Sequence, residues 1–117
     1  MSGKARKCTL KKITPNVVSE IYAMHFDPLF DKPEDLRKFI KDSTGVDSYD
    51  GKVYTNGTGG VALICKTSFS GDGSRMDIHQ LHDGYAVVFR YQNGGHDIYW
   101  FTRQEFAWMF DDGGDAA

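Results

Sequence analysis

The stretch Gly94–Phe110, GGHDIYWFTRQEFAWMF, decides how the C-terminal half of the chain is expected to fold. Large apolar side chains lie on both sides of the polar tetrad Thr102-Arg103-Gln104-Glu105, which divides the stretch. A threonine followed three residues later by a glutamate is a capping box, which begins a helix. The stretch therefore predicts a strand over 96–101 and a short helix after Thr102, whose buried stripe would hold Phe106, Met109 and Phe110.

The residues before this stretch predict the other arm of a hairpin. Period-two alternation predicts a strand over 85–92, and Asn93-Gly94 fits a two-residue turn. In that register one face carries Tyr91, Phe89, Ile98, Val87 and Trp100, and the other carries Arg90, Asp97, Val88, Tyr99, Ala86 and Phe101. Two readings of the second face stay open: helices cover it, or it is a partner surface or a platform for stacking bases.

The same alternation extends towards the middle of the chain. It predicts a small hairpin about Asp50-Gly51 and strands over 60–69 and 75–81. In the later strand Met76 and Ile78 are expected to point inward, while Arg75, Asp77 and His79 point outward. Glycine-rich turns separate these segments, so the expected arrangement is an antiparallel meander.

The N-terminal half reads as helical. Thr14 as N-cap, Pro15 after it, and Val17, Ile21 and Met24 at helical spacing predict a first helix that ends near His25. A second helix is expected from Pro33, with Leu36, Phe39 and Ile40 buried and Gly45 as its stop. Leu29 and Phe30 would pack between the two helices. The predicted fold is α+β: two N-terminal helices, then a four- to five-stranded antiparallel meander and a short C-terminal helix.

The length of 117 residues fits one domain, 1–117. The net charge is −2, but residues 1–19 contribute +5, which leaves −7 for the remainder. We expect a flexible basic arm over 1–7 and a flexible acidic tail over 111–117.

Cys8 and Cys65 are expected to be free thiols. No apolar run is long enough to cross a membrane and no secretory signal is recognisable, so a cytoplasmic location is expected.

No catalytic, cofactor or metal motif stands out. His79-x-x-His82, with Asp77 and His96 nearby, is the best metal candidate, but positions 79 and 82 of a strand point to opposite faces, so no metal is assigned. Outward Lys66, Arg75, His79 and Arg90 supply the residue types of a small ribonuclease without any diagnostic spacing. Enzymatic activity is therefore not expected, and the ribonuclease is kept only as a further alternative.

Two binding functions remain. The leading hypothesis is a non-enzymatic domain that works by protein–protein contact, as an inhibitor, an immunity protein or a viral accessory protein, because tyrosine, tryptophan and arginine are enriched in binding hot spots. Its predicted contact residues are Arg75, Asp77, His79, Arg90, Asp97, Tyr99 and Phe101. The alternative is a single-stranded nucleic-acid-binding module, with an aromatic sheet and the basic arm Lys4, Arg6, Lys7, Lys11 and Lys12. The strand order over 60–110 loosely resembles such modules. Neither the partner nor the oligomeric state follows from the sequence.

Overall fold

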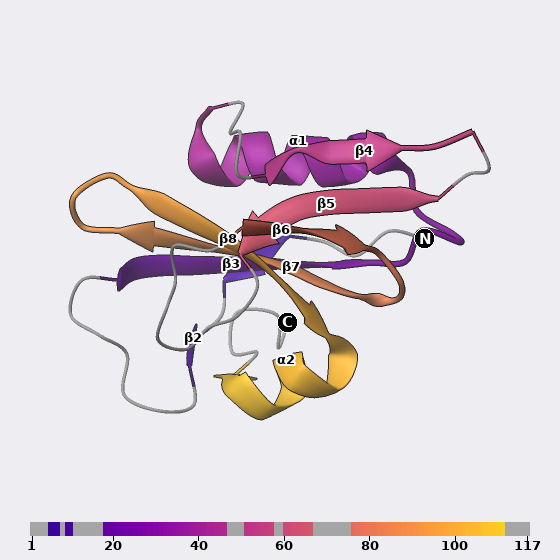
Figure 1. Ribbon diagram of the computed structural model, residues 1–117. Coiled ribbons are helices and arrows are strands. Elements are labelled where there is room, and N and C mark those ends of the chain that lie inside the picture. The colour runs from indigo at the N-terminus through magenta and orange to yellow at the C-terminus, as the bar shows by residue number, and fades with distance from the viewer. Residues whose placement is uncertain are drawn as a thin grey trace.

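The computed structural model describes residues 5–7, 9–10, 18–46, 51–57, 60–66 and 76–111. They form an α+β fold in which a mixed sheet has the strand order β1-β3-β7-β8-β5-β4, and β6 also pairs with β5. The helix α1 lies against one face of the sheet and α2 lies against the other (Figure 1). The sheet strands are β1 (Arg6–Lys7), β3 (Val18–Phe26), β4 (Val53–Thr55), β5 (Val61–Lys66), β6 (Met76–Gln80), β7 (Gly84–Tyr91) and β8 (His96–Thr102). A small second sheet joins β2 (Thr9–Leu10) to β9 (Phe110–Asp111), and the helices are α1 (Pro33–Thr44) and α2 (Arg103–Met109).

The predicted first helix is wrong, because Val18–Phe26 forms the long strand β3. This strand lies between β1 and β7, so its backbone groups find partners on both sides. Its side chains are buried on both faces: Ile21 and Ala23 join one core, and Met24 and Phe26 join the other. A strand covered on both faces reads as a nearly continuous apolar run, which also satisfies a helical spacing. Thr14, Pro15 and Val17 lie outside the described residues.

The predicted meander is also wrong. After β6 the chain does not continue along the sheet edge, because β7 inserts between β3 and β8. The strand β5 then pairs with β6 along one edge. It also pairs with β4 near its start and, in parallel, with β8 at Lys66, so that β5 lies between these two strands in the sheet order. Of the hairpin expected about Asp50-Gly51, residues 47–50 lie outside the described part, and β4 pairs with β5.

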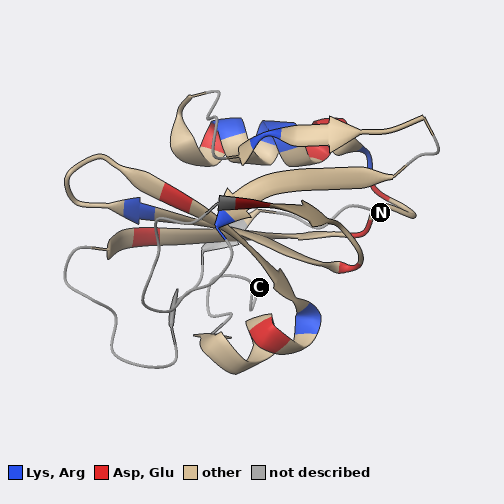
Figure 2. Ribbon diagram, viewed as in Figure 1, with Lys and Arg blue, Asp and Glu red and all other residues tan. Residues whose placement is uncertain are grey.

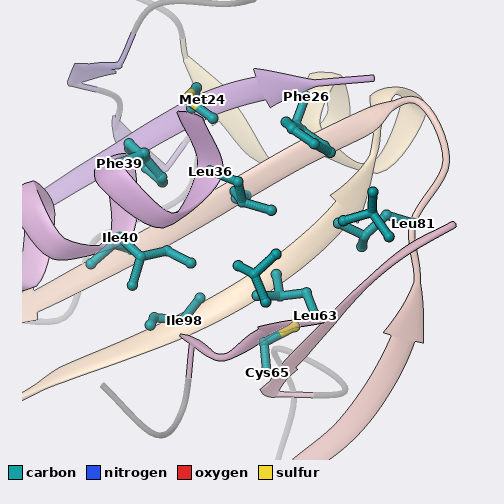
Figure 3. Close-up of a cluster of buried hydrophobic side chains, with 13 residues drawn as sticks. Met24, Phe26, Leu36, Phe39, Ile40, Leu63, Cys65, Leu81 and Ile98 are labelled. Atoms are coloured by element: carbon teal, nitrogen blue, oxygen red, sulfur yellow. The ribbon is translucent and has the colours of Figure 1, made fainter. Parts of the chain in front are cut away.

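The helix α1 confirms the predicted second helix. Pro33 occupies its first turn, and Gly45 ends it with a left-handed φ of 82° while its N–H donates to the Lys41 carbonyl at 2.7 Å. The predicted stripe of Leu36, Phe39 and Ile40 is buried. Figure 3 shows these three side chains directed at residues of the sheet, which include Met24, Phe26, Leu63 and Ile98.

The predicted register of the β7–β8 hairpin is wrong by one residue. Arg90 pairs with His96 and Val88 with Ile98, so the loop has three residues and not two. Gly94, with φ of 91°, donates its N–H to the Tyr91 carbonyl at 3.0 Å, and the Tyr91 N–H donates to Gly95. A three-residue loop with a left-handed glycine is a common hairpin connection.

That shift exchanges the predicted faces of β8 relative to those of β7. Val87, Phe89, Tyr99 and Phe101 now form one core with Phe106 and Phe110. Ala86, Val88 and Ile98 belong to the other core, under α1, with Trp100 packed against it.

The capping box of α2 is confirmed. The Thr102 side chain accepts the Glu105 N–H at 3.1 Å, and the Glu105 carboxylate accepts the Thr102 N–H at 2.9 Å.

Cys65 is a buried free thiol beneath α1. Burial raises the pKa of this thiol to about 12, against a hydrogen bond with the Trp100 backbone that lowers it, so the thiol is protonated and unreactive at neutral pH.

Candidate functional site

Among the residues that the structure describes, the most exposed large apolar side chains belong to the loop that joins β3 to α1. Leu29 is 84% exposed and Phe30 is 73% exposed. They are the only neighbours in sequence among the exposed large apolar residues of the described chain. The expectation that they pack between two helices is therefore wrong. Single exposed apolar residues are ordinary, whereas contiguous exposed apolar surface marks candidate interaction sites, and these two residues are contiguous.

Hydrogen bonds from two aspartates hold this 27–31 loop in one shape. The Asp27 carbonyl accepts the N–H groups of Phe30 at 2.9 Å and Asp31 at 2.8 Å. The Asp27 carboxylate accepts the Leu29 N–H, and the buried Asp31 carboxylate accepts the Asp27 N–H at 2.8 Å. The loop therefore presents Leu29 and Phe30 in a fixed position, and binding would not have to order it.

A cleft of about 510 Å³ opens beside the loop. Its walls come from residues 27–29, from the β4–β5 connection and from the β6–β7 turn. Leu29, Val61 and Leu81 supply apolar surface, while Asp27 and Asp83 are the charged residues that line it. None of the described residues that line the cleft is a lysine or an arginine, and Figure 2 shows acidic positions around the loop and the turn at the same end of the molecule. The cleft thus favours a ligand that combines apolar and positively charged groups.

Asp83 connects this cleft to α2. Its carboxylate makes a hydrogen bond with His25 of β3 through one oxygen, and accepts the Arg103 guanidinium at 3.1 Å through the other. Partial burial alone would raise the pKa of Asp83, but the hydrogen bonds and charges of His25 and Arg103 lower it overall. The carboxylate is therefore held ionised while it fixes the start of α2 against the sheet.

Two of the predicted partner residues lie in the protein core. Tyr99 and Phe101 are each 5% exposed and pack with Phe89 and Phe110 beneath α2 and β9. Burial raises the pKa of Tyr99 to about 12, and the nearby Asp97 carboxylate adds to the effect. The face that carries these two rings is covered by the protein itself, so the reading that leaves it open is wrong.

Four other predicted partner residues are half-buried and do not form one surface. Asp97 accepts the Tyr91 hydroxyl at 2.6 Å and the Lys66 ammonium at 3.4 Å. Arg90 donates to the Ser43 carbonyl at the end of α1, at 3.0 Å. Asp77 and His79 lie on β6 opposite Cys65 and Leu63, towards the core under α1, which reverses the predicted orientation of that strand. Arg75 lies outside the described residues.

The basic residues of the nucleic-acid alternative are mostly beyond the described part of the chain. The backbones of Arg6 and Lys7 form β1, paired with β3. Lys4, Lys11 and Lys12 lie outside the described residues, as does the acidic tail beyond Asp111. Asp111 itself belongs to the backbone of β9.

Two further features concern chemistry and membranes. Within the described residues, no group of three or more histidine, cysteine, aspartate or glutamate side chains is placed to hold a metal ion. His79, Asp77 and His96 therefore do not converge with His82. In the same ranges, no helix is both long enough and apolar enough to cross a bilayer.

Sequence reasoning missed the 27–31 loop. The sequence Asp27-Pro28-Leu29-Phe30-Asp31 has an aspartate at each end of a short turn. Aspartate side chains in turns accept hydrogen bonds from nearby backbone N–H groups, so such a turn can be ordered without packing of its apolar side chains. The pattern was missed because a helix was expected before the loop, and Leu29 and Phe30 were therefore expected to pack between two helices. The chain matches no protein-family model, no curated protein and no solved structure.

Proposed function

We propose that this protein is a non-enzymatic binding domain that works by protein–protein contact, and that Leu29 and Phe30 are the centre of its contact surface. The observation that carries the proposal is the exposure of two adjacent large apolar side chains on a loop held by four hydrogen bonds of Asp27 and Asp31. The loop needs neither side chain for its own order. Phenylalanine is among the side chains enriched at protein interfaces, and an anchor that is already held in position lowers the cost of binding.

The neighbouring cleft defines the chemistry of the partner. Asp27 makes no ion pair among the described residues, whereas the Asp83 carboxylate in the same wall is already paired with His25 and Arg103. The partner surface that fits is an apolar patch with a lysine or arginine at its edge, which would place the cation against Asp27. Such an ion pair at the rim would contribute to the association rate and to specificity.

The experiment begins with capture of the partner from a lysate of the source organism on the immobilised full-length chain. The affinity of the purified partner is then measured for the wild type, Leu29→Ser, Phe30→Ser and the control Trp108→Ser. Trp108 is 70% exposed on α2 and lies outside the proposed surface. We expect each loop variant to weaken binding about tenfold or more, and the control to bind like the wild type.

A second arm tests the charge. Asp27→Asn keeps an oxygen acceptor for the Leu29 N–H but removes the negative charge. We expect slower association and a weaker dependence of affinity on salt. Wild-type affinity in both loop variants, with unfolding temperatures unchanged, would show that the contact surface lies elsewhere.

The nucleic-acid alternative is separated by a different measurement. Fluorescence anisotropy with a labelled single-stranded oligonucleotide, at low and at moderate salt, reports binding that depends on phosphate contacts. The acidic body counts against such binding, since residues 20–117 carry −7. Absence of binding at low salt would exclude this alternative.

A further inference from the structure

The strand β6 has a pairing partner on one side only, within the part of the chain that the structure describes. The Leu81 N–H donates to the Val61 carbonyl at 2.8 Å, which fixes the side that faces β5. Peptide groups alternate in direction along an antiparallel strand, so those of Asp77 and His79 also point at β5. The peptide groups of Met76, Ile78 and Gln80 therefore point away from it, along the open edge.

Within the described residues, this edge carries neither of two common protections of an exposed strand, a lysine or a proline. Ile78, at the centre of Met76–Gln80, is 66% exposed beside the buried Ile64 of β5. The other edge strands are shorter: β1 has two residues and β4 has three. The Val53 carbonyl of β4 also accepts a hydrogen bond from Arg37 of α1 at 3.3 Å.

We infer that β6 docks against β6 of a second copy of this chain, antiparallel, with the two-fold axis at Ile78. In this arrangement Ile78 lies opposite Ile78 of the second copy, and each such pair can exchange two backbone hydrogen bonds. Met76 lies opposite Gln80 of the second copy, and Asp77 lies opposite His79 of the second copy. The strand is thus complementary to itself, because each carboxylate faces a histidine ring, which can donate a hydrogen bond to it, on the same side of the joined sheet.

The match between an acceptor and a donor is the reason for choosing a second copy over an unrelated strand. His79 has a ring nitrogen, Nε2, that is buried and has no hydrogen-bond partner among the described residues. An aspartate on the adjacent strand is the kind of group that such a nitrogen requires. Five paired residues make a small interface, so the dimer is weak and forms at high protein concentration.

The test is sedimentation equilibrium of the full-length chain from micromolar concentrations to about 1 mM. We expect the mass to rise from 13.2 kDa towards twice that value. Ile78→Lys should abolish the rise, because a lysine at the centre of an edge strand blocks pairing. Trp108→Ser, which changes another exposed apolar residue, should dimerise like the wild type.

A charge swap tests the register. His79→Asp places two carboxylates opposite each other twice in the dimer, and should weaken dimerisation about tenfold. Combining it with Asp77→His restores an acid opposite a histidine, and should restore the dimer. Circular dichroism confirms that each variant is folded. A wild type that stays monomeric throughout, or an Ile78→Lys variant that dimerises normally, would overturn the inference.

Discussion

Gly84, the first residue of β7, occupies a position where a side chain does not fit. A Cβ atom there would lie 2.6 Å from the Phe101 carbonyl oxygen and 2.7 Å from the Trp100 ring. The oxygen belongs to the backbone of the neighbouring strand and cannot move aside without disturbing the β7–β8 pairing. The sequence marks Gly84 only as part of a turn, because a close approach between strands depends on which strands become neighbours.

We predict that Gly84→Ala destabilises the protein by about 1–3 kcal/mol, as overpacking in a core does. Urea unfolding followed by circular dichroism measures the change. Gly57→Ala is the matched control, since Gly57 is exposed and a Cβ atom there would meet nothing within 4 Å. The control should change stability by less than about 0.5 kcal/mol. Equal stability of the two variants would show that β7 and β8 do not approach as described.

Among the helices and strands, features that depend on a single segment of the sequence could be predicted. Features that depend on contacts between distant segments could not. Pro33, Gly45 and the Thr102–Glu105 capping box act through local backbone chemistry, and both helices begin where they predict. The apolar residues of Val18–Phe26 fit both a helical spacing and a buried strand. Pairing with β1 and β7 makes the segment a strand. The hairpin register depended on whether the loop held two residues or three, and a single residue changed which side chains share a face.

The contact of α2 with the sheet at Asp83 depends on pH. The pKa of Asp83 is lowered in the folded protein, so its stabilising contribution is fully present above its unfolded value of 3.8 and is lost as the pH falls through the folded value. We predict that Asp83→Asn lowers the unfolding midpoint at pH 6, and that the difference from the wild type shrinks between about pH 5 and pH 2.

Urea unfolding of both proteins at several pH values measures this dependence. Asp42→Asn is the control, because among the described residues the Asp42 carboxylate pairs only with the exposed Lys38 of the same helix, at 3.3 Å. Surface pairs of this kind contribute little, so its difference from the wild type should be small at every pH. A difference for Asp83→Asn that is independent of pH would contradict the role of its charge.

At the scale of the whole molecule, the sheet is covered on both faces, and this moves the candidate site. Aromatic rings that the sequence offered to a partner, Tyr99 and Phe101, instead fill the space between the sheet and α2. The proposed class of function rests on composition, but composition does not locate a contact surface, because exposure is a property of the packed chain. Leu29 and Phe30 carry the same apolar signal in sequence as core residues, and only the structure shows them outside the core.

The most direct test of the central claim is photo-crosslinking at defined positions. Benzoylphenylalanine replaces Phe30 in one version of the full-length chain and Trp108 in another, and each is irradiated in a lysate of the source organism. Both positions are exposed to a similar degree, at 73% and 70%. We predict a discrete crosslinked protein from position 30 that is absent from position 108 and is lost when Leu29→Ser is added. The same crosslinked protein from position 108 alone would contradict the account.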